Sequence, residues 1–165
     1  MLKVPLVGTI LGTIRVLLIL STLPVTILTI GMSFDVSRIT LDQNALFDSY
    51  TTRVDGSDTI SQFTLEITNN GYLFTFSESN VTLSIFDPQS PDTPLGTATQ
   101  SFDIHPGQRQ EKQFEIRMDT ERYLRTAMFN VTTTVDGQLA LDYQGRTIPF
   151  VIFTMTSWNI TRSQR

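Results

Sequence analysis

The single histidine is the natural starting point for chemistry, because acid–base relays and many metal sites need an imidazole. The chain has one histidine, His105, and no cysteine. A Ser–His–Asp relay or a histidine metal site would therefore have to use this residue. His105 is followed by Pro106 and Gly107, a sequence typical of an exposed turn. We therefore predict no catalytic residue and interpret the protein as a non-enzyme.

Other kinds of reactive or ligand-binding site find little support. The lack of cysteine removes thiol nucleophiles, disulfides, thiolate metal ligands and the lipid-bearing cysteine of a lipoprotein. Asp55 and Asp58 flank a turn that could offer carboxylates to calcium, but the spacing of an EF-hand loop is missing, which favours a solvated loop. Gly8 and Gly12 lie in an apolar segment, where they suit a helix-packing face or simple small-residue filler. We predict no metal and no cofactor.

Three N-x-Thr triplets are candidate N-glycosylation sites, at Asn80, Asn130 and Asn159. Each satisfies the acceptor pattern without proline. Such triplets also arise by chance in a threonine-rich chain, so they favour an exported domain only modestly.

The N-terminal segment is apolar enough to cross a membrane. Residues 4–32 carry one charge, Arg15. A span over residues 16–34 has about the 20 residues that a bilayer requires, and it places Arg15 at the entry interface beside Lys3. A position for Arg15 in mid-membrane would cost about 2.5–3.5 kcal/mol. The single tryptophan, Trp158, is either a further interfacial anchor or a lid on the core.

We expect this segment to be a retained anchor. A cleaved signal peptide needs small residues before the cut, typically Ala-x-Ala, and no alanine precedes Ala45. Both positive charges of the segment precede the span, which predicts a cytoplasmic N-terminus and an extracytoplasmic C-terminal domain. The residues after Met32 carry a net charge of −6, which disfavours nucleic acid as a partner. We predict a short cytoplasmic or interfacial segment at 1–15, an anchor at 16–34 and a domain at 35–165.

The remainder of the chain alternates between apolar and polar residues, a pattern typical of half-buried strands. Turns are predicted at 69–71, 105–107, 136–137 and 144–145, with a longer loop at 87–94. A short helix is predicted at about 120–128, capped by Asp119. The fold prediction is an all-β, antiparallel, immunoglobulin-like β-sandwich with one short helix, preceded by a single transmembrane helix. The alternating positions are Phe63, Leu65 and Ile67; Val81, Leu83 and Ile85; Phe114, Ile116 and Met118; Val131, Thr133 and Val135; and Leu139, Leu141 and Tyr143.

Two details of this pattern carry further expectations. In the helical segment, Tyr123, Leu124, Ala127 and Met128 are spaced for one packed face. The run from Tyr72 to Phe76 is apolar on both faces, which suggests a core strand or a strand that lines a groove.

The order of these elements resembles the water-stress and late-embryogenesis-abundant type 2 (LEA type 2) domain family. The matching features are an N-terminal anchor, the stretch 63–72 with its Asn69-Asn70-Gly71 turn, a strand at 80–86, a small turn at Leu95-Gly96, Pro106-Gly107 before the next strand, and a final hairpin at 138–155. The family usually has Asn-Pro-Asn at the first turn, and we expect Asn and Gly to serve there because both tolerate positive φ. The resemblance implies a sandwich of about seven strands with a helix and without catalytic residues.

These observations predict a non-enzymatic, membrane-anchored envelope protein. Its partners would be the lipid bilayer together with an envelope protein, lipid or surface-layer component; the oligomeric state stays open. One alternative is a subunit or accessory of a surface filament, similar to an archaeal pilus or archaellum stator, although Arg15 and Pro24 would interrupt a filament core. A second alternative is a lipid-binding or lipid-transfer module.

Overall fold

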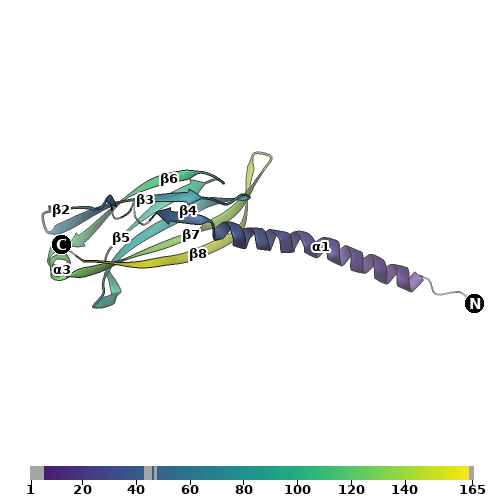
Figure 1. Ribbon diagram of the computed structural model, residues 1–165, viewed down its shortest axis with the longest axis horizontal. Coiled ribbons are helices and arrows are strands. Elements are labelled where there is room, and N and C mark those ends of the chain that lie inside the picture. Colours follow the sequence, from purple (N-terminus) through teal and green to yellow (C-terminus); the bar gives the residue numbers. More distant parts are fainter. Residues whose placement is uncertain (1–5, 43–45, 47, 164–165) are drawn as a thin grey trace, which may run out of the picture.

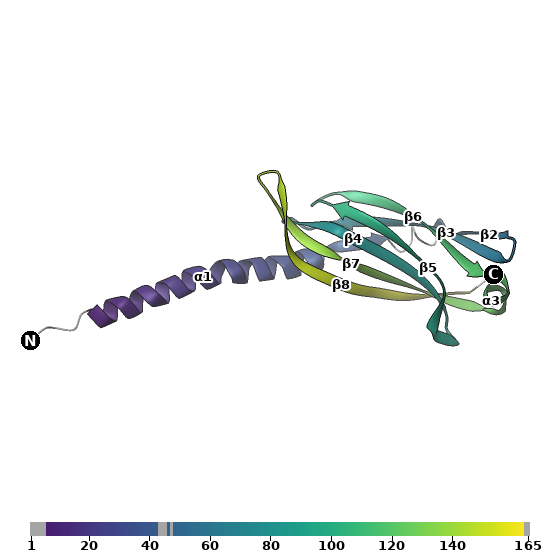
Figure 2. The ribbon, with the colours of Figure 1, turned by 180° about the vertical axis from the view of Figure 1, so that it is seen from behind.

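The protein is a β-sandwich with a long helix projecting from one end (Figure 1). The computed structural model describes residues 6–42, 46 and 48–163, and for residues 6–15, 19, 20, 24, 34, 36 and 156–163 it describes the backbone alone. The view from behind shows the same arrangement, with α1 leaving one end of the sandwich and β2 and α3 lying at the other (Figure 2). We call these the proximal end and the distal end.

Two antiparallel sheets form the sandwich, as predicted. In the first sheet, β3 (Asp58–Asn69) pairs with β6 (Arg109–Asp119) on one side, and on the other with β1 (Ile39–Asp42) and β2 (Thr51–Asp55). In the second sheet, the order is β5 (Ser90–Ile104), β4 (Phe74–Asp87), β7 (Met128–Tyr143) and β8 (Arg146–Ser163).

The alternation in the sequence fills the space between the sheets. Almost every predicted inward position is buried, and each fully buried Phe, Leu or Ile contributes about 1.5–3 kcal/mol. The exceptions are Leu141, which is half-buried, and Tyr143, which is exposed. Both lie near the end of β7, where the β7–β8 hairpin extends beyond the sandwich (Figure 1).

Two glycines predicted to lie in turns lie inside strands. The residues at 136–137 do not end a strand, because β7 runs through them, and Leu95-Gly96 lies within β5. A Cβ atom on Gly137 would come 2.1 Å from the Oγ of Ser79, and one on Gly96 would come 2.7 Å from the carbonyl oxygen of Arg117. Glycine occurs at both sites because a neighbouring strand approaches too closely for a side chain.

The hairpin turns are partly as expected. The turns at 105–107 and 144–145 are present, with Gly107 and Gly145 at positive φ. The loop predicted at 87–94 is shorter, because β4 continues to Asp87 and β5 begins at Ser90. Its prolines fall where the β4–β5 register shifts, so the missing N–H groups interrupt no regular ladder.

The predicted short helix is present but ends earlier than expected. It is α3 (Thr120–Arg125), and the side chain of Asp119 accepts a hydrogen bond from the backbone N–H of Arg122. Of the four residues expected on its packed face, only Tyr123 packs against the core, with its hydroxyl 2.7 Å from that of Tyr50. Leu124 and Met128 are exposed, and Met128 lies outside the helix because it already begins β7.

The apolar N-terminal segment is part of one helix, α1 (Leu6–Val36). Its 31 residues are about 46 Å long. The window Val16–Ser33 is long and apolar enough to cross a membrane, which agrees with the predicted span. The helix backbone continues without a break through residues 6–15, and the predicted cytoplasmic or interfacial position of this part stays a prediction.

Candidate functional site

The junction between α1 and the sandwich is built around a buried carboxylate. Asp35 lies in the last turn of α1, and 1% of its surface is exposed. Its Oδ2 atom accepts hydrogen bonds from the backbone N–H groups of Leu73 (2.8 Å) and Phe74 (2.9 Å), and both carboxylate oxygens lie 3.2 Å from the N–H of Tyr72. One side chain thus serves three consecutive donors at the start of β4.

This carboxylate lies at the C-terminal end of α1, where the helix dipole disfavours a negative charge. A helix C-terminus carries partial negative charge and favours cations there, yet the last turn of α1 contains no basic residue. The three N–H groups supply the compensating positive field. Asp35 therefore stabilises the attachment of α1 to the sandwich, at some cost to the helix itself.

The turn at 69–71 completes the junction. The buried side chain of Asn69 donates to the carbonyl oxygens of Phe74 and Ile104, and its Oδ1 accepts from the N–H of Gly71. We expected positive φ here, but the positive-φ residues of the described chain lie elsewhere. Gly71 is required for space instead, because a Cβ atom would come 2.9 Å from both the Oδ1 of Asn69 and the Cγ of Asp35.

Apolar contacts extend the junction along α1. Leu28 and Met32 pack against the core of the sandwich. A Cβ atom built on Gly31 would be in ordinary contact with Leu73 at 3.5 Å and Phe74 at 3.7 Å. The last two turns of α1 are therefore part of the folded domain, and no flexible linker separates the two.

The expectation for the run from Tyr72 to Phe76 holds only for its second half. Phe74 and Phe76 are fully buried, whereas Tyr72 and Leu73 precede β4 and are exposed. The ring of Tyr72 lies beneath the guanidinium of Arg38, with 4.8 Å between the guanidinium carbon and the ring centroid, and its hydroxyl accepts from Nη1 at 2.9 Å. A cation–π pair of this kind occurs directly beyond the end of α1.

The sequence missed a polar cluster around His105. The Nδ1 atom of His105 lies 2.7 Å from Oδ2 of Asp142 and 3.0 Å from Oγ1 of Thr75, and Thr75 also donates to Oδ2 of Asp142 at 2.7 Å. Thr147 donates to Oδ1 of the same carboxylate. Hydrogen bonds from Thr75 and Thr147, and then the neighbouring His105, lower the pKa of Asp142 below its ordinary value.

This cluster has the residue types of a catalytic relay but not its geometry. In a relay, the carboxylate holds one ring nitrogen and the other nitrogen activates the hydroxyl. Here the hydroxyl of Thr75 and the carboxylate of Asp142 contact the same nitrogen, Nδ1. The arrangement therefore joins β4, β7 and the β5–β6 turn, and it leaves no activated hydroxyl.

A shallow hollow of about 360 Å³ lies over this cluster, between β4, β5, β7 and β8. Glu78 lies at its edge with φ of 46°, where β4 bulges, and its N–H donates to Asp103 while its carboxylate accepts from Gln138. The polar groups named here thus satisfy one another. Its lining residues are Thr75, Ser77, Glu78, Asp103, His105, Gln138, Thr147 and Pro149.

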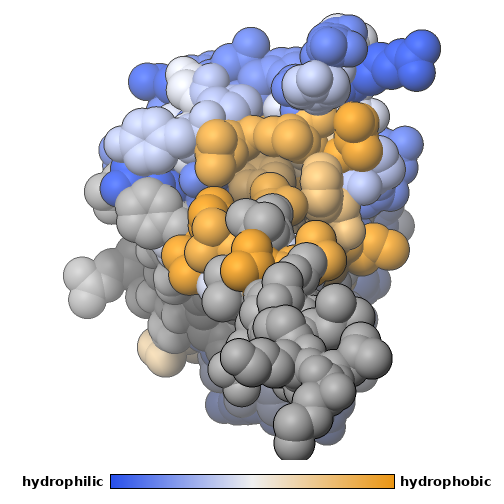
Figure 3. Space-filling model, turned by 90° about the vertical axis from the view of Figure 1, so that its right-hand side faces the viewer, coloured by the Kyte–Doolittle hydropathy of each residue, from blue (hydrophilic) through white to orange (hydrophobic). Residues whose placement is uncertain are grey.

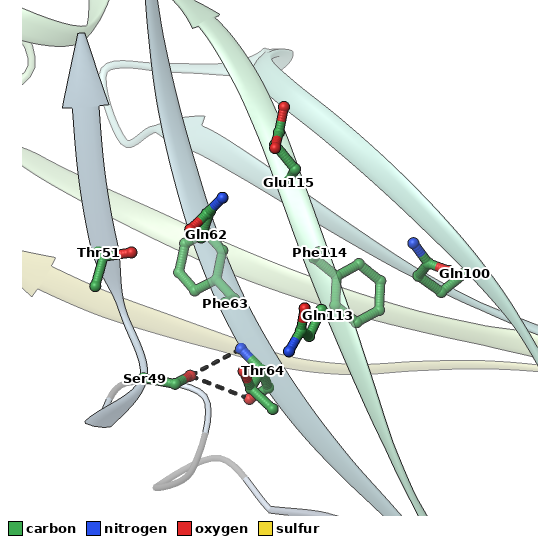
Figure 4. Close-up of a pocket in the computed structure, with 9 residues that line it drawn as sticks. All are labelled: Ser49, Thr51, Gln62, Phe63, Thr64, Gln100, Gln113, Phe114 and Glu115. Carbon is green, nitrogen blue, oxygen red and sulfur yellow. Dashed lines mark hydrogen bonds between the residues drawn. The ribbon is translucent and has the colours of Figure 1, made fainter.

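A second hollow, of about 330 Å³, lies on the opposite sheet (Figure 4). Polar side chains from β2, β3, β5 and β6 surround it, and Ser49 hydrogen-bonds the backbone of Thr64 there. Its two aromatic residues, Phe63 and Phe114, are buried in the core, so they offer no exposed ring on which a planar ligand could stack.

The predicted site residues fall into two groups. Asn80 and Asn130 lie in strands, in β4 and β7, where both are half-buried. Asn80 also donates to Asp136. Glycosylation at both positions stays a prediction. The backbone of Asn159 lies in β8, but its side chain is outside the described residues, as are the side chains of Arg15 and Trp158 and the whole of Lys3.

No protein-family model matches the chain, and no curated protein matches it. Among solved structures, it is similar to a glycosyl hydrolase family 2 member from Bacteroides cellulosilyticus (10% identity, TM-score 0.41), and the match covers 72% of this chain and 15% of the hydrolase. A protein from Archaeoglobus fulgidus matches with 8% identity and a TM-score of 0.33, over 77% of this chain and 95% of its own. A bacterial adhesin from Mobiluncus mulieris matches with 10% identity and a TM-score of 0.32, over 62% and 48%. The likeness concerns the fold alone.

Proposed function

We propose that this protein is a non-enzymatic, single-pass membrane protein that holds a β-sandwich at a fixed height and orientation outside the cell membrane. There the sandwich would bind a component of the cell envelope. The observation that carries this proposal is the junction, in which one buried carboxylate of α1 accepts three backbone N–H groups of the sandwich. A freely tethered binding domain would need no such connection.

The proposed orientation in the membrane rests on the positions of the basic residues. Lys3 and Arg15 precede the apolar segment, and no Lys or Arg follows it until Arg38, which supports a cytoplasmic N-terminus. The resemblance to LEA type 2 domains agrees with an anchored sandwich and remains part of the proposal.

The absence of cysteine allows a direct test of topology. A single cysteine at Val54, an exposed residue of β2, should react with a membrane-impermeant maleimide in intact cells. A single cysteine at Leu2 should react only after permeabilisation. Labelling of the full-length chain is expected, and recovery of a soluble product cut near residue 32 would refute the anchored arrangement.

A distance measurement tests the fixed orientation. Spin labels at Leu23 of α1 and Val54 of β2, both exposed, should give one narrow distance distribution in a reconstituted bilayer. The same pair in the Asp35→Ala variant should give a broad distribution. A broad distribution in the otherwise unmodified chain would contradict a rigid junction.

Partner binding is tested in native membranes with a photo-crosslinker on a single cysteine at Thr99, which is exposed on the second sheet, or at Glu115 on the first. A discrete adduct with one envelope component is expected from at least one face. Absence of any adduct from both faces would remove the binding role.

A further inference from the structure

A group of exposed apolar residues of the sandwich lies around the base of α1, and a separate group, Val54, Leu124 and Met128, lies at the distal end. Figure 3 looks along the helix towards the sandwich and shows hydrophobic residues gathered about its axis, with a hydrophilic surface above them. Four exposed residues of the sandwich form what we call the collar: Tyr72 (69% exposed), Leu73 (52%), Ile148 (42%) and Phe150 (42%).

The strand register and ring contacts place the collar at the proximal end. Ile148 pairs with Leu141, which in turn pairs with Phe74 at the start of β4. The ring of Phe150 packs edge-on against that of Phe74, with 6.2 Å between centroids. Leu73 and Phe74 both face Gly31 of α1.

The position of the charges sets the depth of α1 in a bilayer. With Arg15 at one interface, about 30 Å of hydrocarbon accommodates about 20 helical residues, which reaches Asp35. Gly31 then lies about 6 Å inside that boundary. Moving the helix outward to clear the sandwich would draw Arg15 into the hydrocarbon, at a cost of about 2.5–3.5 kcal/mol.

Leu73 of the collar lies against Gly31, so its side chain cannot stay in water while α1 spans the membrane at this depth. From these observations we infer that the collar is a lipid-contacting surface, and that the proximal end of the sandwich is seated in the interfacial layer of the bilayer. The inference rests on the proposed anchoring by α1. Burial of about 5–10 Å is usual for interfacial apolar surfaces.

The chemistry of the collar fits lipid better than it fits an acidic or basic protein surface. The collar would contribute to membrane binding through apolar contact. Electrostatic attraction is not available, because the residues after Met32 carry a net charge of −6, which does not attract anionic headgroups. Tyr72 has the amphipathic ring that is enriched at membrane interfaces, and the guanidinium of Arg38 lies over this ring. The sandwich would thus contact the bilayer directly, in addition to being attached to it through α1.

Nitroxide labels on single cysteines test the inference on the full chain in phosphatidylcholine vesicles. Labels at Leu73 and at Phe150 should be relaxed more strongly by oxygen, which partitions into lipid, than by a water-soluble nickel chelate. A label at Val54, at the distal end and similarly exposed (67%), should show the opposite preference. Two collar positions in separate segments, one before β4 and one in β8, guard against one variant failing to fold.

A fourth label, at Ile27 of α1, separates the collar from the anchor. If Ile27 is oxygen-preferring while both collar labels prefer nickel, the anchor stands and the seated collar is wrong. If Ile27 also prefers nickel, the proposed anchoring itself fails. If Val54 is as oxygen-preferring as the collar, the domain lies flat on the membrane and the end-on seating is overturned.

Discussion

Both ends of the sandwich use an aspartate that accepts backbone N–H groups, but in very different surroundings. At the proximal end, Asp35 is buried and serves three N–H groups that lie 37–39 positions later in the sequence. At the distal end, Asp119 is exposed and serves the N–H of Arg122, three positions later.

The difference shows how one interaction can act locally or globally. The Asp119 contact caps a helix of six residues and affects little beyond it. The Asp35 contact joins a helix that can span a membrane to a strand in the centre of a sheet. The distal end also exposes apolar residues, among them Val54 and Leu124, but it lies far from α1, whereas the collar at the proximal end surrounds the base of that helix.

The largest effect is expected from Asp35→Ala. The substitution leaves three N–H groups near the protein interior without their charged acceptor, and we expect a loss of about 3 kcal/mol in the free energy of unfolding. Chemical denaturation of the full chain in detergent measures it. The matched variant Asp119→Ala removes one exposed capping bond and should cost about 1 kcal/mol. Equal losses for the two variants would contradict the distinction between the two ends.

A smaller effect is expected from Gly71→Ala at the proximal end. The new Cβ atom would press on Asn69 and Asp35 at about 2.9 Å, and overpacking of this kind costs about 2 kcal/mol. The distal turn offers a control, since Gly56 has open space around it and only a positive φ of 63°. Gly56→Ala should cost about 1 kcal/mol from backbone strain, and thermal unfolding compares the two. A neutral Gly71→Ala would mean that the junction is loosely packed.

The sandwich itself could be predicted because each strand carries its own two-residue alternation. The buried set from Phe63 to Val135 was identified residue by residue for that reason. The apolar span was likewise visible in composition alone, and its predicted range agrees with the helix. Such signals are local, so a single sequence contains them in full.

The junction and the His105 cluster could not be predicted, because their partners are distant in the sequence. Asp35 reads as the polar end of an anchor, and Asp142 as one residue of a strand. Gly96 and Gly137 were misassigned for a related reason: a glycine that begins a turn and a glycine that admits a close neighbouring strand look the same without the neighbour. The triplets at Asn80 and Asn130 also fit plain strand alternation, in which Asn and Thr face outward on either side of a buried valine.

The smallest effect concerns the pH dependence of the proximal end. The pKa of Asp142 is lowered on folding, so its contribution to stability is fully present above the ordinary value of 3.8 and is lost as pH falls through the lower, folded value. The hydrogen bond from Thr75 is the largest cause, so Thr75→Val should raise the pKa of Asp142 towards its ordinary value and weaken this dependence. Carboxyl NMR titration measures the pKa, and unfolding at about pH 6 and about pH 3 measures the stability. The loss should be smaller than that from Asp119→Ala, because the carboxylate is 38% exposed.

Thr59→Val, which removes a threonine pair near α3, serves as the distal control and should leave the titration of Asp142 unchanged. A shift of equal size in both variants would mean that the cluster around His105 does not hold this carboxylate.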